Sequence, residues 1–241
     1  MVFNDTTNKK GLIQDCEDLL GMEDGAISGD TNLLKRFTRM INNWYRTVNA
    51  WIWEASGEWE YDDSNYTDLP IATTNLVDGQ QDYTLPTWAQ KVIRVEVKDN
   101  EGNWHQLQAI DQSQIDEALE EFEETPGLPK YYDLIGPTIF LYPKPSEDYV
   151  TLEGGLKIYV SRSIDEFDYD DTTKEPGFNK DFHQILSLGA CLDYAIGFGL
   201  IDKVRIFQER IAILKDALQK YYGRRHRDLK VKLFPSTESY I

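Results

Sequence analysis

The sequence predicts an α+β protein: a helical bundle with an inserted small antiparallel β-domain and an extended C-terminal arm. Apolar residues recur at steps of three and four in residues 1–60 and 163–222, as they do on one face of a helix. Between these parts, in residues 61–162, apolar and polar residues alternate, as in strands with one buried face. Residues 223–241 show no helical period, so we expect four segments with these bounds.

Two helices are predicted before the β-domain. Residues 8–20 place Leu12, Cys16 and Leu20 on one face, and Gly21 is a suitable end. Residues 31–56 form the longer helix, with Asp30 or Thr31 as its N-cap and Gly57 as its end.

The β-domain is predicted to contain several short strands and one helix. We expect a hairpin turn at 77–81, and a strand in which Ile93, Val95 and Val97 face the core. A turn at 99–102 leads to a returning strand at 104–107, and residues 110–123 read as a helix. The remaining strands are Tyr131–Ile135, Thr138–Tyr142 and Leu156–Arg162.

The C-terminal part begins with an acidic loop at 163–176 and continues with two helices. The first is predicted at 178–198, and the second runs from its cap, Asp202, to Tyr222, where Gly223 ends it. In the arm, Leu229, Val231 and Leu233 alternate with lysines, a pattern typical of an extended segment that adds to a partner. A tail without fixed structure is the alternative interpretation.

Charge separates the arm from the rest of the chain. The net charge is -17, whereas residues 220–241 carry six Lys and Arg against two acidic residues. Free nucleic-acid binders are normally basic, so binding of DNA by the whole chain is disfavoured. The acidic body and basic arm are either a solvated surface with a solubilising tail or a surface that repels DNA and an arm that binds a partner.

No catalytic or metal-binding pattern is present, and we expect no cofactor and no enzymatic activity. Cys16 and Cys191 lie among apolar residues and read as buried free thiols, while His105, His183 and His226 have no ligand or triad spacing. The acidic run containing Glu120, Glu121, Glu123 and Glu124 reads as a solvated helix face, with a DNA-facing surface as the functional alternative. No signal peptide or membrane span is predicted, so synthesis in the cytoplasm is expected.

The order of these motifs resembles that of the head-to-tail connector (adaptor) proteins of tailed bacteriophages, especially the ring-forming kind of short-tailed phages. The resemblance covers about residues 30–222. It is carried by Asp82-Tyr83-Thr84-Leu85-Pro86, Gly102-Asn103-Trp104, Pro129-Lys130-Tyr131-Tyr132, Ile139-Phe140-Leu141-Tyr142-Pro143-Lys144-Pro145, Leu156-Lys157-Ile158-Tyr159-Val160 and Phe182-His183-Gln184-Ile185-Leu186.

The resemblance implies a structural virion protein of the neck or tail. Such proteins form a ring, commonly dodecameric, beneath the portal, with DNA passing through the lumen and a tail or nozzle protein on the other side. Helices form the ring wall and the C-terminal arm reaches into the portal. The arm residues expected to bind the portal are Arg224, Arg225, Arg227, Lys230, Lys232, Leu233 and Phe234.

The sequence is also compatible with two other functions. One is a different ring of the neck or tail, such as a stopper, a tail terminator or a baseplate component. The other is a hydrolase that uses paired carboxylates and a cation, which requires inward-facing acids with perturbed pKa values.

Overall fold

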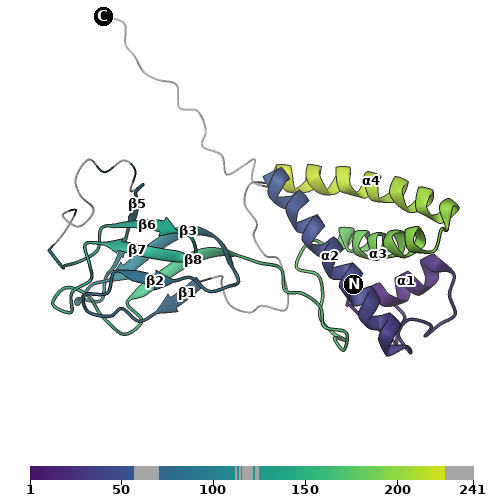
Figure 1. The fold of residues 1–241 in the computed structure, drawn as a ribbon, viewed down its shortest axis with the longest axis horizontal. Helices are drawn as coiled ribbons and strands as arrows, with labels where there is room; N and C mark the ends of the chain where they lie inside the picture. Colours follow the sequence, from purple (N-terminus) through teal and green to yellow (C-terminus); the bar gives the residue numbers. More distant parts are fainter. Residues whose placement is uncertain (57–70, 112, 114, 116–121, 123–124, 226–241) are drawn as a thin grey trace, which may run out of the picture. The chain divides into compact units, whose positions relative to one another are not determined.

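The structure is a computed structural model in which residues 1–56, 71–111, 113, 115, 122 and 125–225 are described. The chain divides into two compact units (Figure 1). The helical unit comprises Met1–Asn65 and Ile164–Ile241, and the β unit comprises Tyr66–Ser163. The prediction that helices and antiparallel-rich sheets occur together in this chain is confirmed.

The helical unit is built around α3, which packs against each of the other helices. A short 3₁₀ helix, η2, comes just before α3. The elements are α1 (Leu12–Leu20), α2 (Thr31–Ser56), η2 (Lys180–Phe182), α3 (Gln184–Gly197) and α4 (Ile201–Arg225). Two of the predicted helix ends are confirmed, because Gly21 ends α1 in the left-handed conformation and Asp30 Oδ1 accepts from the backbone N–H groups of Asn32 and Leu33. Gly57, the predicted end of α2, lies outside the described residues.

Close packing at the centre of the helical unit depends on Gly189 of α3. A Cβ atom placed there would lie 2.1 Å from Cδ2 of Trp44, on α2. Every residue from Ile185 to Cys191 is buried, which explains why α3 is apolar around most of its circumference. Cys16 and Cys191 are both free and buried, as predicted.

The acidic loop at 163–176 is held against α2 through its backbone, and one lysine of the loop neutralises part of its charge. The Asn42 side chain donates to the carbonyl of Phe167 (2.9 Å) and accepts from the N–H of Phe167 (3.0 Å). The Phe167 ring is buried, stacked on Phe3 at 4.8 Å between ring centroids. Lys174 Nζ lies 2.8 Å from Asp165 Oδ1, so part of the loop's charge is neutralised within the loop.

The β unit contains two four-stranded sheets that share one core. The first has the strand order β1-β8-β3-β4 and the second β2-β7-β6-β5, and all pairs except β5/β6 are antiparallel. The strands are β1 (Ile71–Thr74), β2 (Asp82–Thr84), β3 (Ala89–Lys98), β4 (Trp104–Gln106), β5 (Gln108–Ala109), β6 (Tyr131–Ile135), β7 (Thr138–Tyr142) and β8 (Leu156–Arg162).

Two predictions for the β unit are wrong. The turn at 77–81 exists, but it joins β1 and β2, which lie in different sheets, and so makes no hairpin. Ile93 does not face the core: its side chain is 61% exposed, because the register shifts between Val92 and Arg94 and leaves Ile93 without a partner on β8. A bulge of this kind moves every residue before it to the opposite face.

The C-terminal helices also differ from their predicted bounds. The residues before Gln184 form η2, and Asp202 lies within the first turn of α4 rather than at its cap. Gly223 does not end α4, which continues to Arg225. A glycine inside a helix costs only about 1 kcal/mol relative to alanine, and burial of Tyr222 against the core offsets that cost. Most of the helix predicted at 110–123, and residues 226–241, lie outside the described residues.

Candidate assembly surface

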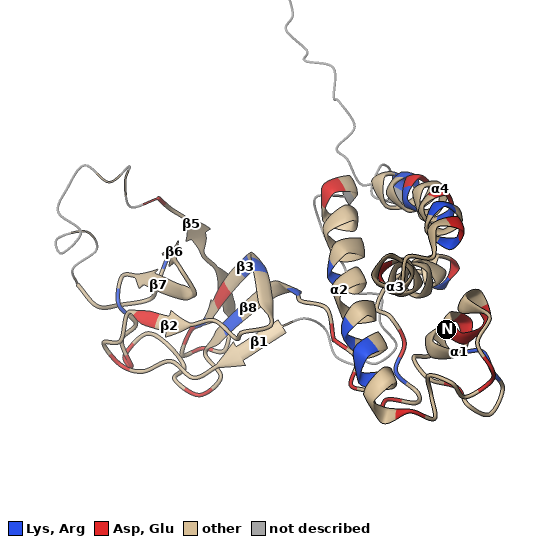
Figure 2. Cartoon of the chain, turned by 45° about the vertical axis from the view of Figure 1, so that its right-hand side comes forward, with Lys and Arg blue, Asp and Glu red and all other residues tan. Residues whose placement is uncertain are grey.

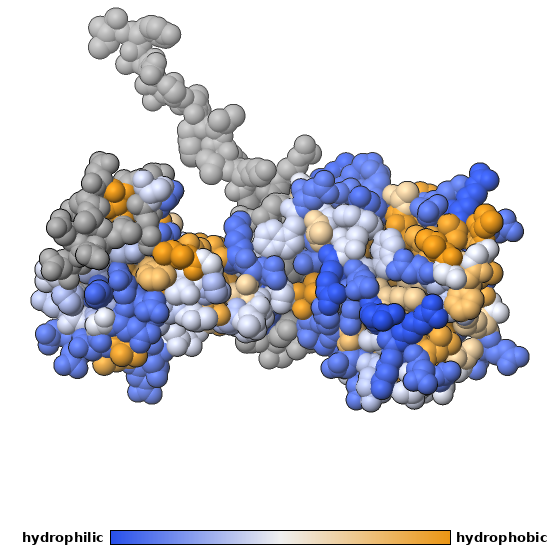
Figure 3. Space-filling model, in the orientation of Figure 1, coloured by the Kyte–Doolittle hydropathy of each residue, from blue (hydrophilic) through white to orange (hydrophobic). Residues whose placement is uncertain are grey.

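Apolar side chains gather on the surface of the helical unit where α3 ends and α4 begins, and along α4 (Figure 3). Of thirteen large apolar side chains exposed among the described residues, seven lie between 196 and 221. We call these seven the assembly surface: Ile196, Phe198, Leu200, Ile201, Ile206, Ile213 and Tyr221. Apolar residues scattered singly need no explanation, but exposed apolar side chains concentrated in one segment are typical of a protein–protein contact.

The outward face of α4 follows from helix geometry. Phe207, Ile211 and Leu218 are buried and mark the inward face. Ile206 and Ile213 are seven residues apart, so they share one face, and that face points away from the buried one. Their exposed fractions are 52% and 70%. α4 therefore has one apolar row that faces the core and a second apolar row that faces outward.

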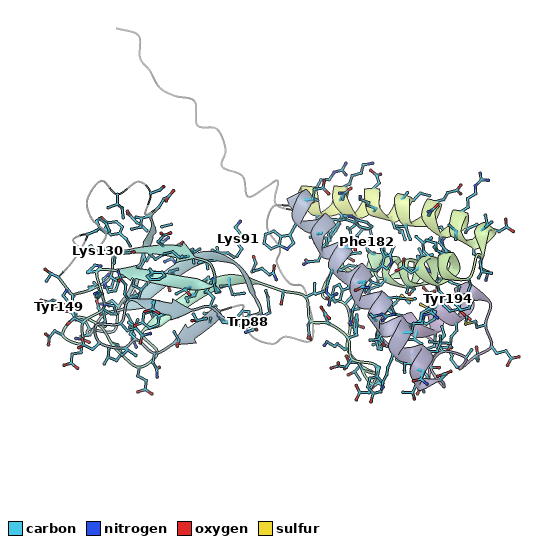
Figure 4. All side chains as sticks on the ribbon, viewed as in Figure 1. Trp88, Lys91, Lys130, Tyr149, Phe182 and Tyr194 are labelled. Carbon is cyan, nitrogen blue, oxygen red and sulfur yellow. The ribbon has the colours of Figure 1, made fainter. Side chains whose placement is uncertain are left out.

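Aromatic rings complete the surface at the end of α3. The rings of Tyr194 and Phe198 stack with centroids 4.4 Å apart, and Arg36 of α2 lies over both, 5.5 and 5.4 Å from their centroids. Tyr194 projects from α3 in Figure 4. The tight turn into α4 uses Gly199, whose φ of 69° favours glycine. The two stacked rings and Arg36 give the assembly surface a rigid end that is both cationic and aromatic.

The charges around the apolar row on α4 pair with each other. Arg205 Nε lies 3.4 Å from Glu209 Oε1, and Lys220 Nζ lies 2.6 Å from Asp216 Oδ2. Basic and acidic residues are mixed along the helix (Figure 2). Exposed pairs of this type add little stability to the free chain. The two pairs are neutral, but α4 as a whole is basic, with seven Lys and Arg against three Asp and Glu. Polar and charged residues around an apolar centre are the usual arrangement of a protein interface.

A second surface feature is a groove of about 250 Å³ between α2 and the acidic loop. Lys35, Arg39 and Arg46 line it from α2, and Glu166 and Tyr169 line it from the loop. Arg46 Nε donates to Glu166 Oε1 at 2.8 Å, and Lys35 Nζ lies 4.6 Å from the Tyr169 ring centroid. Its cations are thus largely engaged with the loop itself.

The family model described as SU10 adaptor protein matches residues 7–229 of the chain. The chain belongs to the SU10 adaptor protein family. This is a family of phage head-tail adaptors, so the resemblance seen in the sequence is confirmed, and the chain is a structural virion protein of a bacteriophage. No curated protein matches the chain.

Two of the residues predicted to bind partners of this adaptor lie among the described residues. Arg224 is exposed in the last turn of α4, and Arg225 ends that helix. The other predicted arm residues, Arg227, Lys230, Lys232, Leu233 and Phe234, lie outside the described residues. So do the predicted channel residues Glu120, Glu121, Glu123 and Glu124.

The assembly surface itself was missed from the sequence. The spacing of Tyr221 and Ile196 within their helices predicts burial of both side chains, but they are 41% and 57% exposed, and Tyr222 takes the buried position instead of Tyr221. One feature of the sequence indicates this surface: Ile206 and Ile213 do not share the helical spacing of the inward residues of the same helix, so they lie on another face.

The two described histidines of the adaptor have structural contacts. His105 Nε2 lies 2.6 Å from Asp99 Oδ2, and this hydrogen bond lowers the pKa of Asp99 to about 2. His183 is buried before α3, with its Nε2 2.8 Å from the carbonyl oxygen of Phe178. Within the described ranges, no group of three His, Cys, Asp or Glu residues is placed to hold a metal ion, and no helix is long and apolar enough to span a membrane.

His183 should make the stability of the helical unit depend on pH. Burial lowers the pKa of His183 from 6.5 to about 4, so the folded state holds it neutral while the unfolded state takes up a proton below pH 6.5. The contribution of His183 to the free energy of unfolding is complete above pH 6.5. It is lost as the pH falls to about 4, and the loss amounts to up to ~3 kcal/mol. Urea unfolding at pH 7.5, 6 and 5 should show a shallower pH dependence for His183→Gln than for the natural chain. Parallel pH profiles would contradict this assignment.

Proposed function

We propose that this adaptor is one subunit of a closed, dodecameric ring that binds beneath the portal, connects head to tail and forms part of the DNA channel. The observation that carries the proposal is the assembly surface on a chain of the head-tail adaptor family. A closed ring repeats one contact between two different faces of the subunit. An exposed group of apolar side chains suits one side of such a contact. The helices of residues 1–60 and 163–222 form a bundle that is the ring wall, and the β-domain of residues 61–162 faces the tail or nozzle protein.

The C-terminal arm, residues 223–241, binds the portal in this proposal. Its cations, Arg224, Arg225, Arg227, Lys230 and Lys232, stand out from a body that is strongly acidic, and Leu233 and Phe234 add apolar anchors. A ring presents many arms at once, so weak single contacts add up to tight docking.

The remaining acidic surface suits a DNA channel. Glu120, Glu121, Glu123 and Glu124 are proposed to face the lumen or a ring surface, where like-charge repulsion keeps the passing DNA from adhering. The protein then acts by binding and positioning alone, without bond chemistry, and it assembles into the virion from the host cytoplasm.

Deletion of residues 226–241 tests the portal contact. The cut falls after α4, which ends at Arg225, so the helical unit should keep its stability. We expect docking to purified portal rings to weaken at least tenfold, measured as bound mass by native mass spectrometry. Two full-length variants separate the contributions: Arg227→Glu with Lys230→Glu and Lys232→Glu, and Leu233→Ser with Phe234→Ser. Unchanged docking by the truncated chain would reject a role for residues 226–241 in binding the portal.

A further inference from the structure

The outer face of the first sheet in the β unit is unusually basic. The strand register places Lys91, Arg94 and Lys98 of β3 on one face, next to Lys157 of β8. The β unit has seven Lys and Arg residues against seventeen Asp and Glu, and four of those seven cations lie on this face. We call it the basic sheet face. Solvated sheet faces are usually polar, but such segregation of one sign in an acidic unit points to a partner.

The only acid among the outward residues of β3 neutralises one of these four cations and leaves the face with a net positive charge. Glu96 is 6% exposed, and its Oε1 accepts from Arg94 Nε at 2.6 Å. Trp104 of β4 lies between two of the lysines, with Lys157 Nζ 3.8 Å and Lys98 Nζ 5.9 Å from its ring centroid. The ring holds these ammonium groups close to the sheet, so the face presents ordered charge.

The same unit carries an acidic tip, made by loops tied together beyond the strand ends. The N–H of Glu147 donates to Asp78 Oδ1 (2.9 Å), and Asn100 Nδ2 donates to the carbonyl of Glu147 (2.9 Å). Tyr149, 56% exposed, lies among them. The exposed carboxylates of the acidic tip are Asp78, Glu101, Glu147, Asp148 and Glu153. In Figure 4, Tyr149 and Lys91 lie at opposite ends of the β unit.

We propose that the basic sheet face of one copy of this chain binds the acidic tip of a second copy. The inference rests on the proposed ring, for which it names one subunit contact. Copies with a net charge of -17 repel each other, so self-association needs contacts that oppose unlike charges. A heterologous contact uses two different surfaces, and one β unit carries both members of a complementary pair.

Duplex DNA fits the basic sheet face less well. Lys98 is followed directly by Asp99 and the loops of the acidic tip, so a long polyanion lying along the face would meet carboxylates within a few residues. A tip of limited size on a neighbouring copy avoids that repulsion. The experiment must therefore distinguish binding of DNA from self-association.

Matched charge reversals in the full chain test the contact. The face-reversed variant is Lys91→Glu, Lys98→Glu and Lys157→Glu; Arg94 is kept because it pairs with buried Glu96. The tip-reversed variant is Glu101→Lys, Glu147→Lys and Asp148→Lys. A control with the same charge change as the face-reversed variant is Lys10→Glu, Lys144→Glu and Lys180→Glu, all exposed and outside both surfaces.

Sedimentation velocity over a concentration series, at low and high salt, measures self-association. We expect the natural chain to associate and each reversed variant to associate at least tenfold more weakly, whereas the control changes less than threefold, where tenfold is about 1.4 kcal/mol. An equimolar mixture of the face-reversed and tip-reversed chains should restore association, because both contacts become complementary again.

Three results would overturn the inference: a natural chain that stays monomeric at every concentration, reversed variants that associate like the control, or a mixture that restores nothing. Loss of duplex DNA binding in the face-reversed chain with unchanged self-association would assign the face to DNA instead. Docking of the natural chain to portal rings is measured separately. If rings form on the portal while the reversals have no effect, the ring proposal stands and only this contact fails.

Discussion

Replacing Ile206 and Ile213 by Asp is expected to abolish ring assembly while leaving the subunit folded. Both side chains are more than half exposed in the subunit, so their loss should change its free energy of unfolding by about 0.5 kcal/mol or less. In an assembled ring, burying an isoleucine contributes about 1.5–3 kcal/mol, and burying an unpaired carboxylate is strongly unfavourable. The two terms add at every contact around the ring, so we expect at least a hundredfold loss of assembly, about 2.7 kcal/mol.

The measurement is the fraction of subunits in rings, from native mass spectrometry with portal present, beside thermal unfolding of the free subunit. Gln208→Asp with Ala212→Asp is the matched control, since both positions are exposed on α4 and lie off the row formed by the two isoleucines. Assembly should survive in the control. Rings that form equally well from the isoleucine variant would show that the outward face of α4 is not a subunit contact.

Elements with a strong period and clear end signals could be predicted from the sequence. The helix at 31–56 and the strands at 131–135, 138–142 and 156–162 have the predicted bounds. Asp30 caps the helix, and glycine and proline flank the strands, so local chemistry alone sets these limits.

Features that depend on tertiary structure could not be predicted. The bulge at Ile93 and the separation of β1 and β2 into two sheets depend on pairing with distant strands. Likewise, the sequence of α4 has apolar residues on both sides, and only packing against α2 and α3 decides that Phe207 is buried and Ile206 is not. The candidate arm could be found from the sequence because net charge is counted without knowledge of the fold. The assembly surface could not be found in this way, because it depends on which side chains the fold leaves exposed.

Glu17→Ala is expected to destabilise the helical unit by about 3–4 kcal/mol. Glu17 lies on α1, is 2% exposed, and its carboxylate closes the loop that leads to α2. Oε1 accepts from the backbone N–H groups of Ile27 and Ser28, both at 2.8 Å, and Oε2 accepts from the N–H of Gly25 at 3.1 Å. Hydrogen bonds to a charged acceptor contribute about 1.5–3 kcal/mol each, and donors left without an acceptor in a buried site add a penalty.

Urea unfolding should show a lower midpoint for Glu17→Ala, with Glu17→Gln in between, because the amide keeps one acceptor oxygen but turns its NH₂ towards backbone donors. Glu23→Ala, which removes an exposed carboxylate from the same loop, is the control and should change the free energy of unfolding by about 0.5 kcal/mol or less. An equal effect at both positions would contradict the closing role of Glu17. The comparison also separates two routes to failed assembly: Glu17→Ala should lose rings only as the subunit unfolds, whereas the α4 substitutions should lose rings from a folded subunit.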